Sequence, residues 1–181
     1  MNQLELPILD AIQTIKNPIL DTIMLVITHL GDAGILWILT GVALLFFKKY
    51  RKNGLIVLFS LLAGLLITNI VLKNAVARIR PCDLNATVEL LIERPHDWSF
   101  PSGHTTSSFA AATALLYTNK KIGVPALILA ILIAFSRMYL YVHFPTDILA
   151  GIIIGAGCAL LMILIFKKID LFILKKKAEK A

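Results

Sequence analysis

The sequence predicts an all-α membrane protein, with six transmembrane helices preceded by an amphipathic helix in the membrane interface. Its composition points to this class, because 58% of the 181 residues are hydrophobic and only 16% are charged. Soluble domains are about half apolar and a quarter charged. In addition, residues 54–72, 122–142 and 148–166 are apolar runs close to the ~20 residues that a helix needs to cross a bilayer.

The first sixteen residues form the predicted interfacial helix. Four apolar residues share one helical stripe of this segment: Leu4, Ile8, Ile12 and Ile15. The segment lacks the basic start and the small-residue cleavage site of a secretory signal, so we expect no cleavable signal peptide. Asn17-Pro18 then signals a new helix, with Asn as the N-cap and Pro in the first turn.

Two short apolar stretches come next, residues 19–30 and 33–47, with a turn at Gly31-Asp32 between them. Each stretch is shorter than the ~20 residues of a full crossing. We interpret them as one hairpin of two spans.

Four further spans complete the predicted bundle: residues 54–72, 105–118, 122–142 and 146–166. The only long polar segment of the chain, residues 73–104, separates the first two of these spans. Gly151 and Gly155 lie about one helical turn apart in the last span, which would allow close helix packing. Since no internal repeat divides the chain, we expect a single domain over residues 1–181, ending in a basic tail from 167 to 181.

Basic residues set the orientation of this bundle. Twelve Lys and Arg lie in residues 48–52, in residues 119–121 and in the tail, which all fall on one side of the predicted spans. The positive-inside rule makes this side cytoplasmic, so the polar segment and the turn at 143–146 face outward. The net charge of +7 then concerns topology and lipid headgroups, and we expect membrane lipids rather than nucleic acid as partners.

Polar and charged residues gather in three clusters on the outward side. A single cation at the end of a span commonly reaches toward the lipid headgroups. That interpretation explains poorly why three cations, two histidines and a carboxylate meet at one membrane level. The clusters are Lys73 with Arg80-Pro81, then Pro101-Ser102-Gly103-His104, then Ser136-Arg137 with His143 and Asp147.

These residue types suit phosphoryl transfer, in which negative charge spreads over the equatorial oxygens of the transition state. Arg80 and Arg137 each offer a planar fork of donors, and Lys73 offers a point charge. Ser102 and the backbone of Gly103 add neutral donors at a turn that begins a helix, whose positive end favours an anion.

Two histidines allow the nucleophile and the leaving-group acid to be separate side chains. His143 and Asp147 are four residues apart at the start of a helix, so the carboxylate can reach the imidazole and fix its tautomer. The sequence has no cysteine spacing typical of a metal site, and we expect no metal.

The three clusters resemble the tripartite signature of the type 2 phosphatidic acid phosphatase superfamily, which also includes vanadium haloperoxidases and glucose-6-phosphatase. All three parts are intact between residues 73 and 147. The resemblance implies a six-helix core and metal-independent dephosphorylation through a phosphohistidine, without a cofactor. It assigns the nucleophile to His143, its orienting partner to Asp147 and the leaving-group acid to His104. The phosphate would be held by Lys73, Arg80, Ser102, Gly103 and Arg137.

The substrate implied by the resemblance is a lipid phosphate or diphosphate. The short chain and the outward site resemble small bacterial members that act on polyprenyl diphosphate or phosphatidyl lipids. Undecaprenyl diphosphate is our first choice, because the carrier diphosphate is released on the outer face; phosphatidylglycerol phosphate and phosphatidic acid stay open. Residues 82–99, which no motif decodes, would contribute to this selectivity. The oligomeric state is open as well.

Two other functional classes compete with a lipid phosphatase. A haloperoxidase would use the same phosphate-binding residues to hold vanadate as a cofactor, but those relatives are mostly larger soluble proteins. A non-enzymatic lipid transporter would distribute charges along a pathway through the bilayer. Between residues 105 and 166 the only charged residues are Lys120, Lys121, Arg137 and Asp147, which trace no such pathway.

Overall fold

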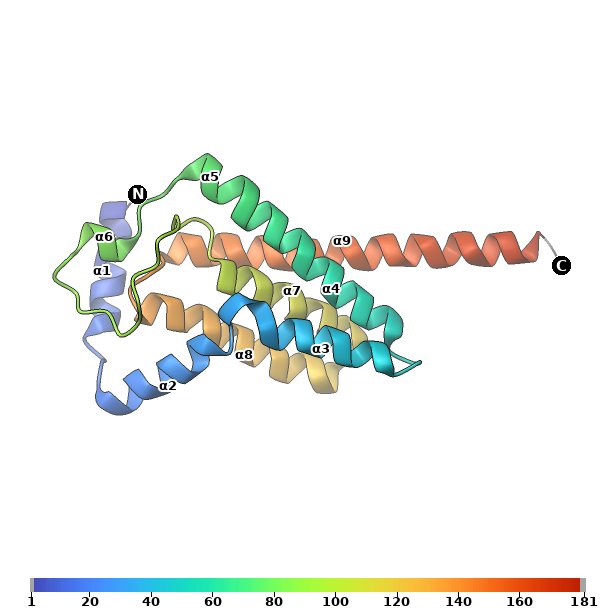
Figure 1. Ribbon diagram of the computed structural model, residues 1–181, viewed down its shortest axis with the longest axis horizontal. Helices are drawn as coiled ribbons and strands as arrows, with labels where there is room; N and C mark the ends of the chain where they lie inside the picture. Colours follow the sequence, from blue (N-terminus) through green and yellow to red (C-terminus); the bar gives the residue numbers. More distant parts are fainter. Residues whose placement is uncertain (1, 180–181) are drawn as a thin grey trace.

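The computed structural model describes residues 2–179, and every regular element within this range is helical. The long helices run along one axis of the molecule, and the last of them extends well beyond the others (Figure 1). In chain order the elements are α1 (Asn2–Gln13), α2 (Pro18–His29), η1 (Asp32–Gly34), α3 (Ile35–Phe46), α4 (Arg51–Leu65), η2 (Leu66–Leu72), α5 (Lys73–Val76), α6 (Pro81–Leu84), α7 (Gly103–Thr118), α8 (Lys120–Tyr139) and α9 (Pro145–Ala178).

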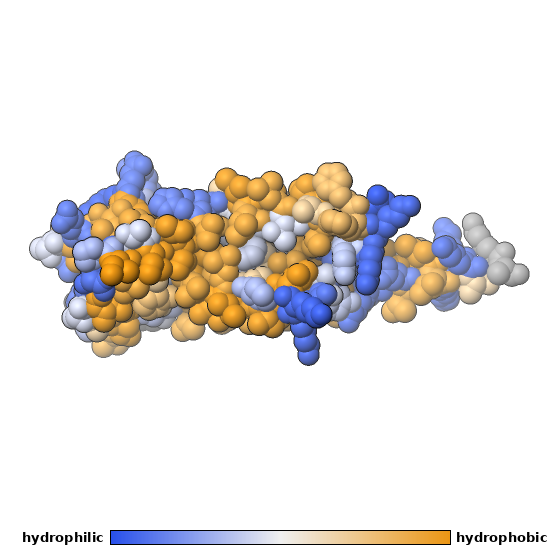
Figure 2. Space-filling view, turned by 90° about the horizontal axis from the view of Figure 1, so that it is seen from below, coloured by the Kyte–Doolittle hydropathy of each residue, from blue (hydrophilic) through white to orange (hydrophobic). Residues whose placement is uncertain are grey.

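The protein is a multi-pass membrane protein. Within residues 2–179, four helical stretches are long and apolar enough to cross a bilayer: Pro18–Phe46, Arg51–Leu84, Lys120–Tyr139 and Pro145–Ala178. Hydrophobic side chains cover much of the length of the bundle, and hydrophilic ones gather near its ends (Figure 2). The all-helical class is therefore confirmed, whereas the count of six spans is not.

The predicted hairpin over residues 19–47 is wrong. Helices α2 and α3 follow one another in the same direction (Figure 1) and together make one stretch of 29 residues. The turn at Gly31-Asp32 is present, but it only offsets the two helices. Ala33 and Gly34, with φ of 50° and 67°, interrupt the helical backbone without reversing the chain. Each helix is about half a bilayer long, and end to end they suffice for a single crossing.

This correction moves the N-terminal helix to the end of the bundle that carries the predicted site. A hairpin over residues 19–47 would return the chain to the side on which it began and place α1 beside the basic loop at 48–52, whereas a single stretch begins on the other side. Instead, Gln13 donates a hydrogen bond to the carbonyl of Tyr139 at 3.0 Å, and Tyr141 donates one to Asp10 at 2.7 Å. Leu9 is fully buried in the same contact. The location of α1 in the membrane interface stays a prediction, and its exposed Leu4 and Ile8 are consistent with it.

Helix α7 lies at the centre of the bundle, in contact with α4, α8 and α9. Four alanines allow its neighbours to approach closely, and all four are fully buried: Ala110, Ala111, Ala112 and Ala114. On the facing side of α9, a Cβ added to Gly155 would lie 2.3 Å from the carbonyl oxygen of Thr106. The close packing predicted for Gly151 and Gly155 is therefore confirmed.

A π-helical segment, η2, joins α4 to α5 within one long helix. Such segments insert an extra residue into a helical turn and frequently occur at functional sites. Here the segment carries Thr68 and Asn69 to the wall of a cavity, and Lys73 follows directly after it.

Candidate active site

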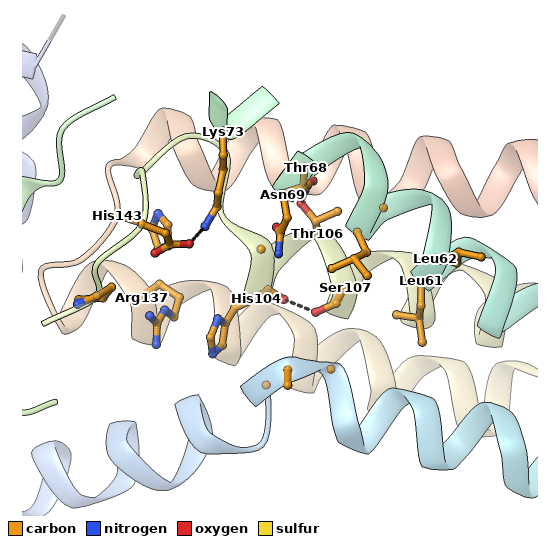
Figure 3. Close-up of a pocket in the computed structure, with 18 of the residues that line it drawn as sticks. Leu61, Leu62, Thr68, Asn69, Lys73, His104, Thr106, Ser107, Arg137 and His143 are labelled. Atoms are coloured by element: carbon orange, nitrogen blue, oxygen red, sulfur yellow. Dashed lines mark hydrogen bonds and ion pairs between the residues drawn. The ribbon is translucent and has the colours of Figure 1, made fainter. Parts of the chain in front are cut away.

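The three clusters converge at one end of the bundle. Lys73 lies at the end of the π-helical segment, Arg80 precedes α6, and His104 is in the first turn of α7. Arg137 comes from the last turn of α8, and His143 from the turn between α8 and α9. All five line a single cavity of about 530 Å³, and four of them lie together at its polar end in Figure 3.

His143 is 2% exposed, and its two ring nitrogens have different neighbours. Nε2 lies 3.2 Å from Nη1 of Arg80, and Nδ1 lies 3.5 Å from Oδ2 of Asp147. Because a guanidinium only donates, this arrangement assigns the lone pair to Nε2 and the proton to Nδ1. Burial lowers the pKa of His143 to about 3, so the ring is neutral at neutral pH. A neutral imidazole whose lone pair faces the cationic end of the cavity is suited to attack phosphorus.

Asp147 is fully buried behind His143 and is held from several sides. Its Oδ2 accepts hydrogen bonds from the backbone N–H of Phe144, at 2.8 Å, and from the hydroxyl of Ser99. Its Oδ1 accepts one from Arg78 at 2.6 Å. The expected spacing between His143 and Asp147 is therefore realised in the structure, with additional supports that the motif does not name.

Arg137 lines the cavity and has a buried donor without a partner in the described part of the chain. Its Nη1 donates to the hydroxyl of Thr28 at 2.6 Å. Its Nε is fully buried and has no hydrogen-bond partner among residues 2–179. A buried donor without a partner is unfavourable by about 1–3 kcal/mol, which an anionic ligand in the cavity would relieve.

Asp97 also lines the cavity, although the sequence did not predict it as a site residue. Its carboxylate pairs with the ammonium of Lys73 and accepts from Nη2 of Arg80 at 2.6 Å. Although burial opposes its ionisation, hydrogen bonding by Lys73 and the charge of Arg80 hold the pKa of Asp97 at about 2. A carboxylate therefore occupies donors that a phosphate would need. A lone Asp in an undecoded loop carried no signal of this position.

Ser102 and Gly103 form the turn that begins α7. Ser102 is fully buried, and its hydroxyl oxygen accepts from the hydroxyl of Thr105 at 3.0 Å and from the Thr105 N–H at 3.4 Å. This makes Ser102 the N-cap of the helix. Gly103 lines the cavity itself, at the positive end of α7.

His104 has an acidic partner that the motif does not predict. Its Nε2 lies 2.9 Å from Oδ1 of Asp32, in the interruption between α2 and α3. Since an ionised carboxylate only accepts, Nε2 carries a proton. Gly31 makes this approach possible, because a Cβ there would lie 2.9 Å from the His104 ring. The turn at Gly31-Asp32 was visible in the sequence, but its meeting with α7 was not.

The cavity has an apolar end as well as a polar one. Away from the cations it continues between α3 and α4, where its walls are aliphatic: Ile38, Leu58, Leu61, Leu62 and Leu65. Figure 3 shows Leu61 and Leu62 at the opposite end of the cavity from Lys73 and His143. This lining is complementary to an anionic group at one end and to hydrocarbon at the other.

Comparison with known proteins agrees with this geometry. The PAP2 superfamily matches residues 53–170 of the chain. The chain belongs to this superfamily.

Two relatives and one solved structure indicate the kinds of protein that this PAP2 chain is similar to. An undecaprenyl-diphosphatase of Sulfolobus acidocaldarius is 34% identical over 70% of the chain and 62% of the relative's length. The undecaprenyl-diphosphatase BcrC of Bacillus subtilis is 35% identical over 77% of the chain and 71% of the relative. The crystal structure of a PAP2-type phosphatidylglycerolphosphate phosphatase from Bacillus subtilis superposes with a TM-score of 0.76, at 30% identity, over 92% of the chain and 86% of that protein.

Proposed function

We propose that this protein is a membrane lipid phosphatase that removes the terminal phosphate of undecaprenyl diphosphate at the outer leaflet. The observation that carries the proposal is the position of His143. Its unprotonated Nε2 faces Arg80 at the cationic end of a cavity whose other end is apolar. A lipid with an anionic headgroup matches both ends of such a cavity.

In the proposed first step, Nε2 of His143 attacks the terminal phosphorus atom. The bond between phosphorus and the bridging oxygen breaks, and a phosphohistidine forms. Burial lowers the pKa of His104 to about 4 in the empty site, so its protonated form has to be stabilised by the bound anionic headgroup and by Asp32 at Nε2. This form gives a proton to the leaving oxygen, and His104 is left neutral. Asp147 faces the proton on Nδ1 and stabilises the positive charge that develops on the ring of His143.

In the second step, neutral His104 takes a proton from water as the water oxygen attacks the phosphohistidine. The P–N bond breaks, inorganic phosphate forms, and His143 returns to its neutral state. Lys73, Arg80 and Arg137 bind the equatorial oxygens in both steps, and the first turn of α7 with Gly103 adds backbone donors. Every proton and charge in this scheme is handled by side chains and water, so we propose that turnover is independent of metal ions.

The choice of lipid rests on the relatives. The chain is similar to undecaprenyl-diphosphatases from two organisms, at 34% and 35% identity. Phosphatidylglycerol phosphate is the second candidate, because a phosphatase for that lipid shares the fold at 30% identity over nearly its whole length. Phosphatidic acid is the third, since it has the same combination of phosphate and acyl chains.

Phosphate release from purified protein in detergent micelles tests the proposal. We expect the largest kcat/KM with undecaprenyl diphosphate, among a panel that includes phosphatidylglycerol phosphate and phosphatidic acid. The rate should be unaffected by EDTA, and the His143→Ala variant should release no phosphate. A tenfold preference for phosphatidylglycerol phosphate would replace the first substrate by the second. Phosphate release by the His143→Ala variant would contradict the proposed phosphohistidine intermediate.

A further inference from the structure

A buried chain of charged residues lies behind His143 and Asp147, and the proposed mechanism does not use all of it. Arg78 donates to Oδ1 of Asp147 at 2.6 Å through Nη1, and to Oε1 of Glu5 at 2.7 Å through Nη2. The side chains of Arg78 and Glu5 are each 10% exposed, and that of Asp147 is fully buried. Glu5 belongs to α1, about 140 residues away from Asp147 in the chain.

We propose that Arg78 is a positioning residue for the Asp147–His143 pair, and that Glu5 fixes Arg78 in place. The N-terminal helix is then part of the catalytic unit. This inference rests on the proposed phosphatase function, because it assigns Arg78 a role in the same reaction.

The hydrogen bonds of Asp147 show how Arg78 would act. Oδ2, the oxygen nearest to Nδ1 of His143, accepts from the N–H of Phe144 and from Ser99. Arg78 holds Oδ1, the other oxygen. With both oxygens bound, the plane of the carboxylate is fixed relative to the imidazole. Without Arg78, Oδ2 keeps its two donors, but Oδ1 is no longer held and the plane of the carboxylate can tilt. The contact between Asp147 and Nδ1 of His143, which fixes the tautomer of the ring, is then weakened.

Glu5 fixes Arg78 from the opposite side. Its Oε1 binds Arg78, and its Oε2 accepts from the backbone N–H of Thr146 at 2.9 Å. That N–H lies in the first turn of α9 and has no acceptor within its own helix. The guanidinium of Arg78 also lies over the ring of Phe144, at 4.0 Å from its centroid. Arg78 is thus confined between α1 and the start of α9.

Arg78 contrasts with Arg80, two residues further along the chain. Arg80 lines the cavity and contacts Nε2 of His143, which is the face that would meet the substrate. Arg78 reaches the far oxygen of Asp147 and is not among the residues that line the cavity. We therefore expect Arg78 to act on turnover through Asp147, and to contribute little to binding of the phosphate.

Steady-state kinetics with undecaprenyl diphosphate separate these roles. We expect Arg78→Gln to lower kcat by roughly 10- to 100-fold, within the range of coupling measured between contacting residues, and to change KM by less than about threefold. Arg78→Lys should recover part of the loss, because it restores the charge without the fork. Arg51→Gln is the matched control, since Arg51 is exposed at the start of α4, away from the site, and donates to the carbonyl of Leu45. It should leave both constants within about twofold.

A double-mutant cycle decides whether Arg78 acts through Asp147. In an Asp147→Asn background, Arg78→Gln should lower kcat by less than about threefold, because the group that it positions is already lost. An equal loss in both backgrounds, or a rise in KM alone, would overturn the proposal. Glu5→Gln is the second variant, which keeps the shape of the side chain and remains testable if Arg78→Gln does not fold. It should show the same pattern with a smaller loss.

A spectroscopic readout keeps the inference separate from the identity of the substrate. In ¹⁵N-histidine spectra, His143 of the wild type should have the Nδ1–H tautomer, and Glu5→Gln and Arg78→Gln should shift its ring signals. If wild type hydrolyses no lipid of the panel, the proposed function fails while these spectra still test the positioning. Ring signals of His143 that are unchanged in both variants would overturn it.

Discussion

At the scale of single residues, the neighbours of His143 determine its tautomer and its protonation state. Arg80 faces Nε2 and Asp147 faces Nδ1, so one nitrogen is assigned to attack and the other to carry the proton. Burial of the ring then keeps it neutral, which is the form that a nucleophile requires.

This burial predicts how stability depends on pH. The pKa of His143 is about 3 in the folded protein and 6.5 in a model compound. As the pH falls, His143 is therefore protonated near pH 6.5 in the unfolded chain, but only near pH 3 in the folded protein. Stability from this residue is fully present above pH 6.5 and falls with decreasing pH, by about 1.4 kcal/mol per pH unit. Between pH 7.5 and 5, the apparent Tm of wild type in detergent should fall more than that of His143→Gln. Parallel curves for the two proteins would contradict this assignment.

Asp97 leads to a second prediction at this scale. It is ionised at neutral pH and engages Lys73 and Arg80, so it competes with an incoming phosphate for the same donors. The Asp97→Asn variant keeps the shape of the side chain and removes its charge. We expect vanadate, an analogue of the phosphoryl group, to inhibit this variant with a Ki about five- to tenfold lower, on the order of 1 kcal/mol for one partly exposed charge. Asp83→Asn is the control, since Asp83 pairs with Arg94 and is not among the residues that line the cavity. Weaker inhibition of Asp97→Asn would mean that Asp97 instead holds the cations in place.

The sequence predicted five side chains that meet at the cavity, but not the residues that support them. Ser102, also predicted to hold phosphate, caps α7 and is not among the residues that line the cavity. Lys73, Arg80, His104, Arg137 and His143 all line the cavity, as their order and spacing indicated. Their partners come from parts of the chain with no recognisable pattern, because a single carboxylate or hydroxyl looks the same in a sequence whether it faces solvent or a buried cation. These partners are Glu5, Thr28, Asp32, Arg78, Asp97 and Ser99.

At the scale of elements, the packing of α9 against α7 determines where the first turn of α7 lies. A Cβ at Gly155 would lie 2.3 Å from the carbonyl oxygen of Thr106 and 2.9 Å from the N–H nitrogen of Ala110, both in the backbone of α7. Backbone atoms of a packed helix cannot rotate away as a side chain can, so any larger residue forces the two helices apart.

Two glycines of α9 provide a matched pair for testing this contact. Gly155→Ala should lower the apparent Tm by roughly 3–10 °C, because overpacking a tight interface is unfavourable by about 1–3 kcal/mol. Gly157→Ala should leave the Tm unchanged or raise it, since nothing lies within 4 Å of a Cβ at that position and alanine favours a helix. Thermal unfolding of both variants in the same detergent compares them directly. Equal changes of Tm in the two variants would show that helices α7 and α9 can separate enough to accommodate a Cβ at residue 155 without loss of stability.

The sequence failed at the element scale where backbone geometry overrides composition. Residues 19–30 and 33–47 contain a turn signal between two apolar stretches, which is also the pattern of a hairpin. Positive φ at Ala33 and Gly34 instead offsets two helices that continue in one direction. Composition does not report the direction in which a chain leaves a turn. A hairpin at this position would also have placed α1 at the wrong end of the bundle.

At the scale of the whole molecule, charge separates the two ends of the bundle. Residues 48–52, residues 119–121 and the exposed end of α9 are rich in lysine, and they lie at the end away from the site. The cations at the other end include Lys73, Arg80 and Arg137, which line the cavity. The positive-inside rule depends on the charge of the loops and not on the number of spans, so we propose that the site faces outward.

Cysteine labelling in intact cells tests this orientation. Ala86 is exposed in the loop after α6 at the site end, and Lys49 is exposed in the loop between α3 and α4 at the other end. A membrane-impermeant maleimide should label Ala86→Cys in intact cells, and Lys49→Cys only after the membrane is permeabilised. The natural cysteines, Cys82 and Cys158, are both buried, so the wild type provides the unlabelled control. The reverse pattern would open the cavity to the cytoplasm. A lipid diphosphate released at the outer leaflet could then not reach His143 without first crossing the membrane.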